Sequence, residues 1–179
     1  MSFSRALYFA AILPPPGIRE QVLELKLEMK EKFETSHALK LPAHITLVPP
    51  VWLENKQEHL FVDAVRIVTE ETPSFPVELK DFGHFGQRVI FINAINPSRL
   101  KEFYQNLLNS LTEFLPNKGA KLHPHVTIAT RDLSRQNFNK AWKEYKDRSF
   151  SVEFNAESLT IFKHNGKTWN ILETFLLKK

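Results

Sequence analysis

A four-residue phrase that occurs twice constrains this chain more than any other feature of its sequence. HITL at residues 44–47 recurs as HVTI at residues 125–128, and a proline lies one or two places ahead of each histidine. Along a β-strand, successive side chains point to opposite faces. We therefore expect the histidine and the threonine of each copy to share one face, while the apolar residues point into a core.

The elements around the two copies are predicted to repeat as well. The pattern predicts a strand and a helix before each copy, and a helix and a strand after it. In the first half, Pro49 and Pro50 are expected to close the strand of the phrase before a helix over 54–71. The first predicted helix has one apolar face, formed by Ile18, Val22, Leu25, Met29 and Phe33.

The second half follows the same order. Asn96 is expected to cap a helix that begins at Pro97, and Ser134 is expected to cap the helix after the second phrase. The apolar faces of these helices are predicted to be Leu100, Phe103, Leu107, Leu111 and Phe114, and then Phe138, Trp142 and Tyr145. Other strands are predicted at 6–13, 75–83, 88–95 and 149–154, and a hairpin at 158–177 around an Asn-Gly turn.

These patterns predict an internal duplication of approximately residues 3–83 and 88–156, with a C-terminal hairpin over 157–177. We expect an α+β fold with two lobes of antiparallel sheet related by a pseudo-twofold axis, helices packed outside and a central cleft. Residues 1–179 would then form a single bilobal domain. The pseudo-twofold axis would bring the polar faces of the two phrases together across the cleft.

The composition excludes several classes of site. The chain has no cysteine, which excludes disulfides, thiolate metal sites and a cysteine nucleophile, and which fits a reducing compartment such as the cytoplasm. A net charge of +4 suits a phosphate-bearing ligand. The apolar run at 6–13 is too short to span a membrane and leads into three prolines, so we interpret it as a strand rather than a signal peptide.

Two imidazoles and two hydroxyls around one point suit phosphoryl chemistry. An imidazole titrates near pH ~6.5, so one histidine can accept a proton from a nucleophile while the other donates one to a leaving group. Threonine hydroxyls can donate hydrogen bonds to the non-bridging oxygens of a phosphate as charge develops there. We therefore predict His44, Thr46, His125 and Thr127 as catalytic residues of a site that needs no metal and no cofactor.

Paired phrases of this kind in a duplicated α+β chain resemble the 2H phosphoesterase superfamily, in particular its 2′-5′ RNA ligase (LigT-like) and cyclic phosphodiesterase group. The stretches RALYFAAILPP, FGHFGQRVIFI and HNGKTWNILETFLL are also similar to that family. The resemblance implies cleavage of 2′,3′-cyclic phosphates or 2′-5′ phosphodiesters of RNA or nucleotides, with reverse ligation in some members. It carries the catalytic pairs over to His44 and Thr46, and to His125 and Thr127.

Two further residues are candidates for substrate binding. Many LigT-like relatives have an arginine five places after the second motif histidine, whereas Arg131 of this chain lies one position later. Strand parity would place Arg131 on the polar face of the second phrase if the strand continues that far. Phe85 lies between two glycines on a predicted hairpin turn, where it could stack on a base or cover the core.

Two other functions stay open on the sequence alone. A non-catalytic RNA-binding module on this fold would be marked by the loss of a motif His or Thr, and none is lost. A metal-dependent hydrolase could use His123 and His125, and a chelator would inhibit it. The remaining histidines are expected to be solvated or structural: His37, His59, His84 and His164.

The expected partner is RNA or a nucleotide with a cyclic or 2′-5′ phosphate. We expect no membrane association and no obligate protein partner, so the protein would act as a monomer in the cytoplasm.

Overall fold

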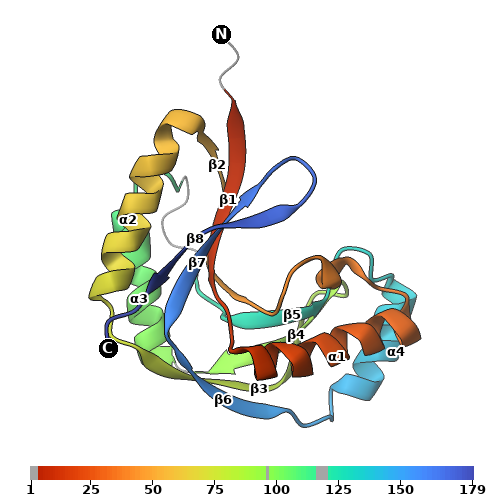
Figure 1. Cartoon of the computed structure of the whole chain (residues 1–179). Helices are drawn as coiled ribbons and strands as arrows, with labels where there is room; N and C mark the ends of the chain where they lie inside the picture. The colour runs from red at the N-terminus through yellow and green to blue at the C-terminus, as the bar shows by residue number, and fades with distance from the viewer. Residues whose placement is uncertain (1–3, 96, 116–120) are drawn as a thin grey trace.

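The fold is built on one curled β-sheet in which neighbouring strands are antiparallel (Figure 1). The computed structural model describes residues 4–95, 97–115 and 121–179. The strands are β1 (Arg5–Ile12), β2 (Ile45–Glu54), β3 (Phe75–Phe85), β4 (Val89–Ile95), β5 (His125–Ala129), β6 (Ser151–Ala156), β7 (Ser158–His164) and β8 (Trp169–Leu176). Their order across the sheet is β6-β3-β4-β5-β2-β1-β7-β8.

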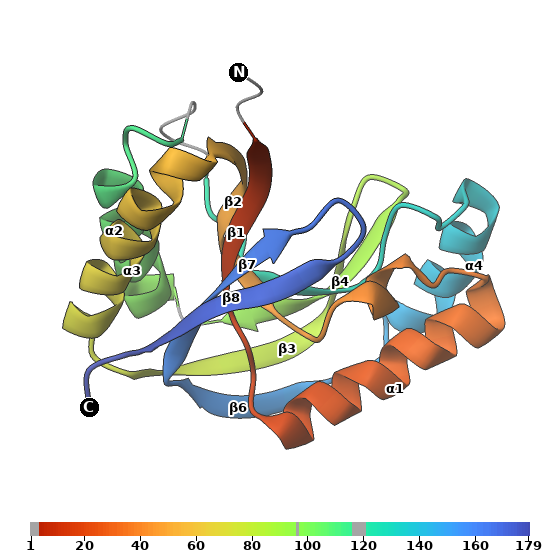
Figure 2. The same ribbon diagram turned by 45° about the horizontal axis from the view of Figure 1, so that its top comes forward.

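The helices cover the sheet in two pairs. They are α1 (Pro16–Phe33), α2 (Glu58–Glu71), α3 (Pro97–Ser110) and α4 (Arg135–Tyr145), with the 3₁₀ turns η1 (His37–Lys40) and η2 (Asn55–Gln57). Figures 1 and 2 show α2 beside α3 on one side of the molecule and α1 beside α4 on the other. Among the described helices, none combines the length and the apolar character that crossing a membrane requires.

The two strands that carry the repeated phrase meet in the middle of the sheet. β2 and β5 are joined by the pair Ile45 and Val126. On one side follow β1, β7 and β8, and on the other follow β4, β3 and β6, so each half contains four strands in a matched order. The predicted α+β fold with two related lobes is therefore confirmed.

Each half of the sequence contributes one helix to the other lobe. α1 follows β1 along the chain but packs against α4 and β5, whereas α3 follows β4 but packs against α2 and β2. The lobes are therefore interleaved, since neither consists of one continuous stretch of chain. The duplication boundaries at 3–83 and 88–156 stay a prediction from the sequence pattern.

The apolar faces of α1 and α4 follow the predicted spacing, whereas α3 ends at Ser110, so the predicted Leu111 and Phe114 lie in the turn after it. All five apolar residues predicted for the first helix are buried. In α4, Phe138 and Tyr145 are buried and Trp142 is half-buried, while the Ser134 hydroxyl accepts a hydrogen bond from the Asn137 N–H at 3.1 Å, as an N-cap does. The other predicted cap, Asn96, lies outside the described residues.

The prediction that two prolines close the first strand is wrong. β2 runs through Pro49 and Pro50 to Glu54, and α2 begins only at Glu58, after η2. Tyr8 pairs with Val51 and Ala10 pairs with Val48, so β2 advances by one residue more than β1 between these pairs. This β-bulge contains the prolines, and a bulge tolerates proline because it interrupts the ladder of backbone hydrogen bonds.

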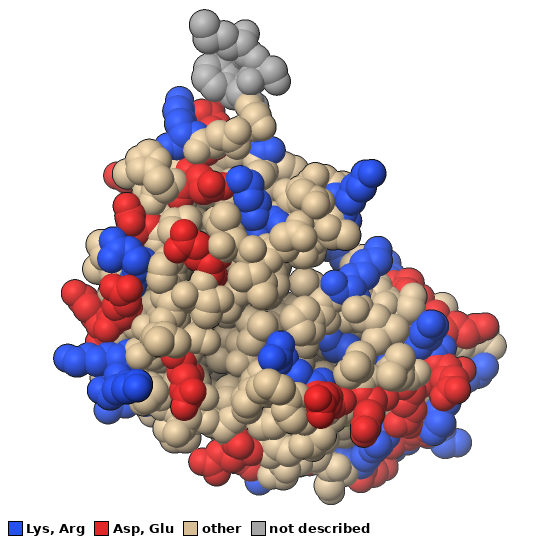
Figure 3. All heavy atoms as spheres, viewed as in Figure 1, with Lys and Arg blue, Asp and Glu red and all other residues tan. Residues whose placement is uncertain are grey.

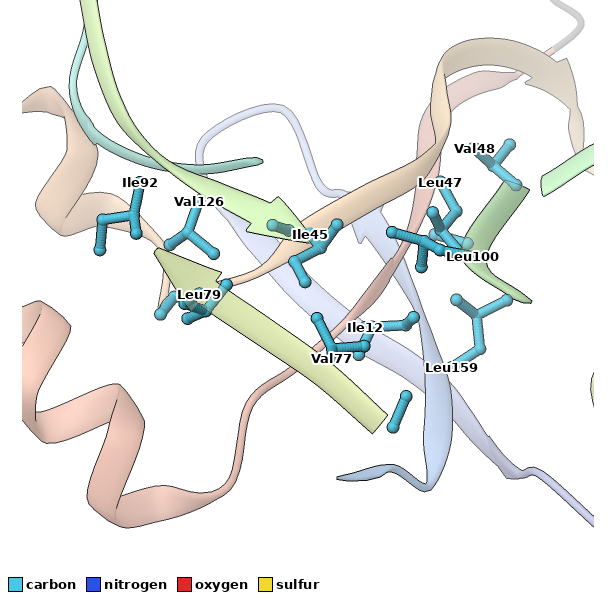
Figure 4. Close-up of a cluster of buried hydrophobic side chains, with 14 of the residues drawn as sticks. Ile12, Ile45, Leu47, Val48, Val77, Leu79, Ile92, Leu100, Val126 and Leu159 are labelled. Atoms are coloured by element: carbon cyan, nitrogen blue, oxygen red, sulfur yellow. The ribbon is translucent and has the colours of Figure 1, made fainter. Parts of the chain in front are cut away.

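Ile45 and Val126 point into a core that is continuous through both lobes. Figure 4 shows them near Leu79 of β3 and Ile12 of β1, with Leu159 of β7 further along the same cluster. The strand pair that joins the lobes is therefore stabilised on its buried face by apolar contacts from both lobes.

Removing the side chain of Ile45 should weaken the whole fold. We expect Ile45→Ala to lower the free energy of unfolding by about 2–5 kcal/mol, because it leaves a cavity where the lobes meet. Ile171→Ala is the matched control, because Ile171 lies on β8 and is 59% exposed. Its effect should stay within about 0.5 kcal/mol. Urea denaturation measures both values, and equal losses would contradict a central role for Ile45.

Candidate active site

The register of β2 and β5 brings the four predicted catalytic residues onto one face. Because Ile45 pairs with Val126 in antiparallel strands, the same register places His44 opposite Thr127 and Thr46 opposite His125. All four side chains point away from the buried face that carries the central pair. The pseudo-twofold axis thus passes through the central pair, and the two histidines lie diagonally across it.

Both imidazoles are oriented by the same backbone contact. Nδ1 of His44 lies 2.8 Å from the carbonyl oxygen of Pro42, and Nδ1 of His125 lies 2.7 Å from the carbonyl oxygen of His123. A carbonyl only accepts hydrogen bonds, so each Nδ1 carries a proton and donates it to the residue two positions earlier. In the neutral rings Nε2 is therefore the free base on each side of the axis.

Burial lowers the pKa of both histidines. For His44 burial lowers the pKa to about 4; the hydrogen bond to Pro42 opposes this effect, and the charges of Lys26 and His125 add to it. For His125 burial again lowers the pKa; the hydrogen bond to the His123 carbonyl opposes this effect, and the charge of the His123 ring adds to it. Both rings are consequently neutral at neutral pH, because desolvation disfavours the charged form.

Lys26 is a buried cation close to this site. Its side chain lies under the protein surface in α1, and its Nζ donates a hydrogen bond to the carbonyl oxygen of Leu41 at 2.9 Å. Burial lowers the pKa of Lys26 to about 8, so the ammonium is charged at acidic and neutral pH. The contact fixes the segment that leads into His44. The sequence carried a signal for this burial, since Lys26 lies four residues after Val22 on the apolar side of the helix.

Aromatic rings surround each histidine, but unequally. The ring of His44 lies 5.5 Å from that of Phe9, which stacks on Phe162 at 4.6 Å and meets Trp169 edge-on at 4.7 Å. Phe162 is only 2% exposed. These rings exclude water from the side of the site that carries His44, and this burial lowers its pKa.

His125 has a more open aromatic neighbourhood. Its ring lies 5.0 Å from Phe85 and 4.9 Å from Phe91. Phe85 packs on Phe91 at 4.4 Å and is 40% exposed, so it both covers a neighbour and leaves part of its ring open beside His125. Phe85 can therefore both cover the core and leave part of its ring open for stacking, the two possibilities that the sequence offered.

Gly83 allows Phe91 to lie where it does. A Cβ atom added at Gly83 would lie 2.5 Å from the Phe91 ring, well inside the normal contact distance. Gly83 and Phe91 also pair across β3 and β4. Sequence reasoning missed both residues, because a glycine beside a turn gives no sign that an aromatic ring crosses over it.

The threonine hydroxyls are open for a ligand. Among the described residues, the hydroxyl groups of Thr46 and Thr127 have no hydrogen-bond partner, and both residues are half-buried. A hydroxyl in this position can donate a hydrogen bond to an anionic oxygen between the two imidazoles.

The strand does not continue as far as Arg131, which was the condition for placing this residue on the polar face of the second phrase. β5 ends at Ala129, and Arg131 has a φ of 58°, a left-handed conformation that ends strand parity. The Asp132 N–H donates a hydrogen bond to the Thr130 carbonyl at 2.7 Å, which closes a three-residue turn around Arg131. Its side chain is exposed beyond the end of the strand.

His123 and His125, which the sequence offered as a possible metal-binding pair, pack against aromatic rings. The rings of His123 and His125 are 6.2 Å apart, and His123 packs against Phe85 at 5.1 Å. Within residues 4–95, 97–115 and 121–179, no three His, Cys, Asp or Glu side chains come together as a metal site would require.

Two of the other histidines contact neighbouring structure. His84 packs edge-on against Trp142 at 4.6 Å, and Nδ1 of His164 accepts the Gly166 N–H at 3.1 Å in the last hairpin.

Comparison with known proteins gives one family. A family model described as the 2′-5′ RNA ligase superfamily matches residues 14–168. A protein of Geobacillus kaustophilus that is named as a phosphoesterase is 22% identical over 173 residues, which cover 95% of each chain. Another so named, from Halalkalibacterium halodurans, is 26% identical over 146 residues, 80% of this chain and 84% of the relative.

Solved structures show the same fold. LigT of E. coli in complex with 3′-AMP has a TM-score of 0.72 at 19% identity, over 98% of this chain and 100% of that chain. A protein of Thermus thermophilus has a TM-score of 0.64 at 18% identity, over 96% of this chain and 98% of that one. At these identities the likeness supports the fold and no finer property.

The role of Gly83 can be tested without a substrate. We expect Gly83→Ala to displace the Phe91 ring from His125, which should loosen the packing and raise the pKa of His125 toward its ordinary value of about 6.5. An NMR titration of the His125 Cε1–H signal measures this pKa. Gly17→Ala is the control, because a Cβ atom there meets nothing within 4 Å. An unchanged His125 titration in Gly83→Ala would refute this role.

Proposed function

The chain belongs to the 2′-5′ RNA ligase superfamily of phosphoesterases, and we propose that it cleaves 2′,3′-cyclic phosphates or 2′-5′ phosphodiesters of RNA or nucleotides without a metal ion. The observation that carries the proposal is the matched pair of imidazoles, each oriented by a carbonyl two residues earlier. E. coli LigT, which shares the fold, has been solved with 3′-AMP, NADP⁺ and ATP, and these ligands favour a nucleotide substrate here as well.

In the proposed reaction, a phosphate lies between the two imidazoles. Nε2 of His44 accepts a proton from a water molecule, whose oxygen attacks phosphorus. The bond from phosphorus to a ribose oxygen breaks on the opposite side, where protonated Nε2 of His125 donates its proton to that oxygen. Thr46 and Thr127 donate hydrogen bonds to the non-bridging oxygens. Ligation is the same displacement with a ribose hydroxyl in place of water.

The unequal surroundings support this division of roles. The pKa of His44 is lowered to about 4, which keeps the ring neutral and able to accept a proton. His125 is less enclosed, beside the half-open ring of Phe85. A bound phosphate carries negative charge, which favours the protonated form of a neighbouring imidazole. His125 would therefore take up its proton when the substrate binds.

We also propose that Phe85 and Arg131 bind the substrate. Phe85 offers part of an aromatic face beside His125, on which a nucleobase can stack next to the reacting phosphate. Arg131 brings a positive charge to the end of β5, a few residues beyond Thr127. A guanidinium binds phosphate oxygens through two parallel hydrogen bonds.

Incubation with a 2′,3′-cyclic nucleotide in the presence of EDTA separates this proposal from the alternatives. Turnover with the chelator supports a metal-independent reaction, and the product isomer identifies which ribose oxygen leaves. Activity that EDTA abolishes and Zn²⁺ restores would favour a metal-dependent hydrolase. Binding without turnover would favour an RNA-binding module.

Substitution of either histidine should remove most of the activity. We expect His44→Ala and His125→Ala each to lower kcat by roughly 10²- to 10⁴-fold, the usual contribution of a positioned acid or base. The double variant should lose much less than the product of the two effects, because the groups act together. Thr46→Val and Thr127→Val should cost about 10²-fold or less, since proton transfer stays possible.

The control for these variants is His59→Ala, an exposed position on α2. Its kcat on a 2′,3′-cyclic nucleotide should equal that of the unchanged protein. Wild-type turnover in either His44→Ala or His125→Ala would eliminate the two-histidine mechanism.

The pH dependence should reflect the lowered pKa values. The base must be deprotonated, so kcat/KM should fall as the pH drops toward the pKa of His44, about 4. The acid must be protonated, so kcat/KM should fall again as the pH rises above the lowered pKa of His125. The profile should be bell-shaped with its maximum below pH ~6.5. A maximum well above neutral pH would contradict these pKa shifts.

Lys26→Met should shift one limb of that profile. Removal of the buried positive charge raises the pKa of His44, so the acidic limb should move to higher pH while the alkaline limb stays in place. Lys30→Met is the matched control, since Lys30 is an exposed residue of the same helix. A shift of both limbs, or of neither, would show that Lys26 has no specific effect on His44.

A further inference from the structure

Three arginines converge on a hollow next to the candidate active site. The hollow has a volume of about 530 Å³ and lies between the turn after β3 and the loop from β5 to α4. Its lining consists of Gln87, Arg88, Arg131, Asp132, Leu133, Ser134 and Arg135. The lining contains no aromatic ring and one apolar side chain, so it offers charge and hydrogen bonds and no surface for stacking a base.

The arginine charges are not neutralised within the part of the chain that the structure describes. Arg88, Arg131 and Arg135 form no ion pair there, whereas other surface arginines do, such as Arg66 with Asp63 at 3.1 Å and Arg99 with Glu102 at 3.5 Å.

The one carboxylate of the lining is engaged elsewhere. Asp132 accepts hydrogen bonds from the Thr35 hydroxyl at 2.6 Å and from the backbone N–H groups of Ser36 and His37 at 2.9 and 3.0 Å. The N-terminus of α4, which has no acidic residue in its first turn, adds to the positive potential of the hollow.

The hollow adjoins the ends of β3 and β5, close in the chain to residues of the candidate active site. Arg88 follows Phe85 by three residues, across a turn closed by the Arg88 N–H and the Phe85 carbonyl, and the Phe85 ring is 5.0 Å from His125. Arg131 follows Thr127 by four residues, which span at most about 14 Å. Figure 3 shows Lys and Arg side chains beside the notch beyond the β7–β8 hairpin, whereas basic and acidic side chains are mixed over the helices.

We propose that Arg88, Arg131 and Arg135 bind a second phosphate, on the 5′ side of the nucleotide whose phosphate reacts. This inference rests on the proposed function of the neighbouring site. The ligand is either the phosphodiester that links the terminal nucleotide to the rest of an RNA strand, or the 5′-phosphate of a single nucleotide. Three guanidinium groups match its oxygens through paired hydrogen bonds. The protein therefore prefers substrates that carry a phosphate at this position.

Steady-state kinetics with three substrates test the proposal. They are adenosine 2′,3′-cyclic phosphate with a 5′-hydroxyl, the same nucleotide with a 5′-phosphate, and a diadenylate that ends in a 2′,3′-cyclic phosphate. We expect KM to be about tenfold lower for the second and third than for the first, as one or two charge-assisted hydrogen bonds allow. A gain with the diadenylate alone identifies the RNA phosphodiester as the ligand, and a gain with both shows that a phosphate suffices.

Substitution of the arginines should remove this preference. Arg88→Gln and Arg135→Gln should each raise KM about tenfold for the two phosphate-bearing substrates, with little change for the 5′-hydroxyl nucleotide. Arg99→Gln, on the far lobe, is the matched control and should change none of the three values. Equal KM values for all three substrates, or equal losses on all three, would overturn the proposal.

A binding measurement keeps this test separate from the proposed reaction. Calorimetry should give a lower Kd for adenosine 3′,5′-bisphosphate than for 3′-AMP, and Arg88→Gln should abolish the difference. This result requires no turnover, so it would support the phosphate site even if no cyclic nucleotide were cleaved. Turnover combined with equal Kd values would leave the proposed function intact and refute the second phosphate site.

Discussion

The pairing of Ile45 with Val126 is the contact on which both the fold and the site depend. The two side chains fill the core where the lobes meet, and the same register places both histidines and both threonines on the opposite face. A slip of one residue in either strand would bury a histidine and a threonine and expose the apolar pair. The core therefore selects the register that assembles the site, so stability and geometry of the site are set by one interaction.

The surroundings of the site then determine the state of the imidazoles. Carbonyl acceptors hold the proton on each Nδ1, and burial keeps both rings neutral when no ligand is present. The negative charge of a bound phosphate would favour protonation of the less enclosed ring, that of His125. Binding of the substrate would thus itself produce the acid–base pair. Before binding, both histidines are neutral, and burying a neutral imidazole costs less free energy than burying a charged one.

The sequence predicted the features that depend on local pattern. The alternation within the repeated phrases and the helical spacing of the α1 residues from Ile18 to Phe33 are set within a few positions, and both are present in the structure. The sequence did not predict the bulge at Pro49 and Pro50, because the bulge depends on pairing with β1, which lies far away in the sequence. The Gly83–Phe91 contact and the turn at Arg131 were missed for related reasons, since each depends on contacts or backbone geometry that spacing does not encode.

Duplication alone would not give the distinct acid and base that we propose for this site. A strictly symmetric pair of imidazoles would have equal pKa values, and no feature of the protein would decide which ring accepts the proton. Here the side chains around the imidazoles break that symmetry, because the charge of Lys26 lowers the pKa of His44 and Trp169 packs on the aromatic cluster on that side. The pseudo-twofold axis provides two opposed imidazoles, and the unequal packing around them gives each one a different proton affinity.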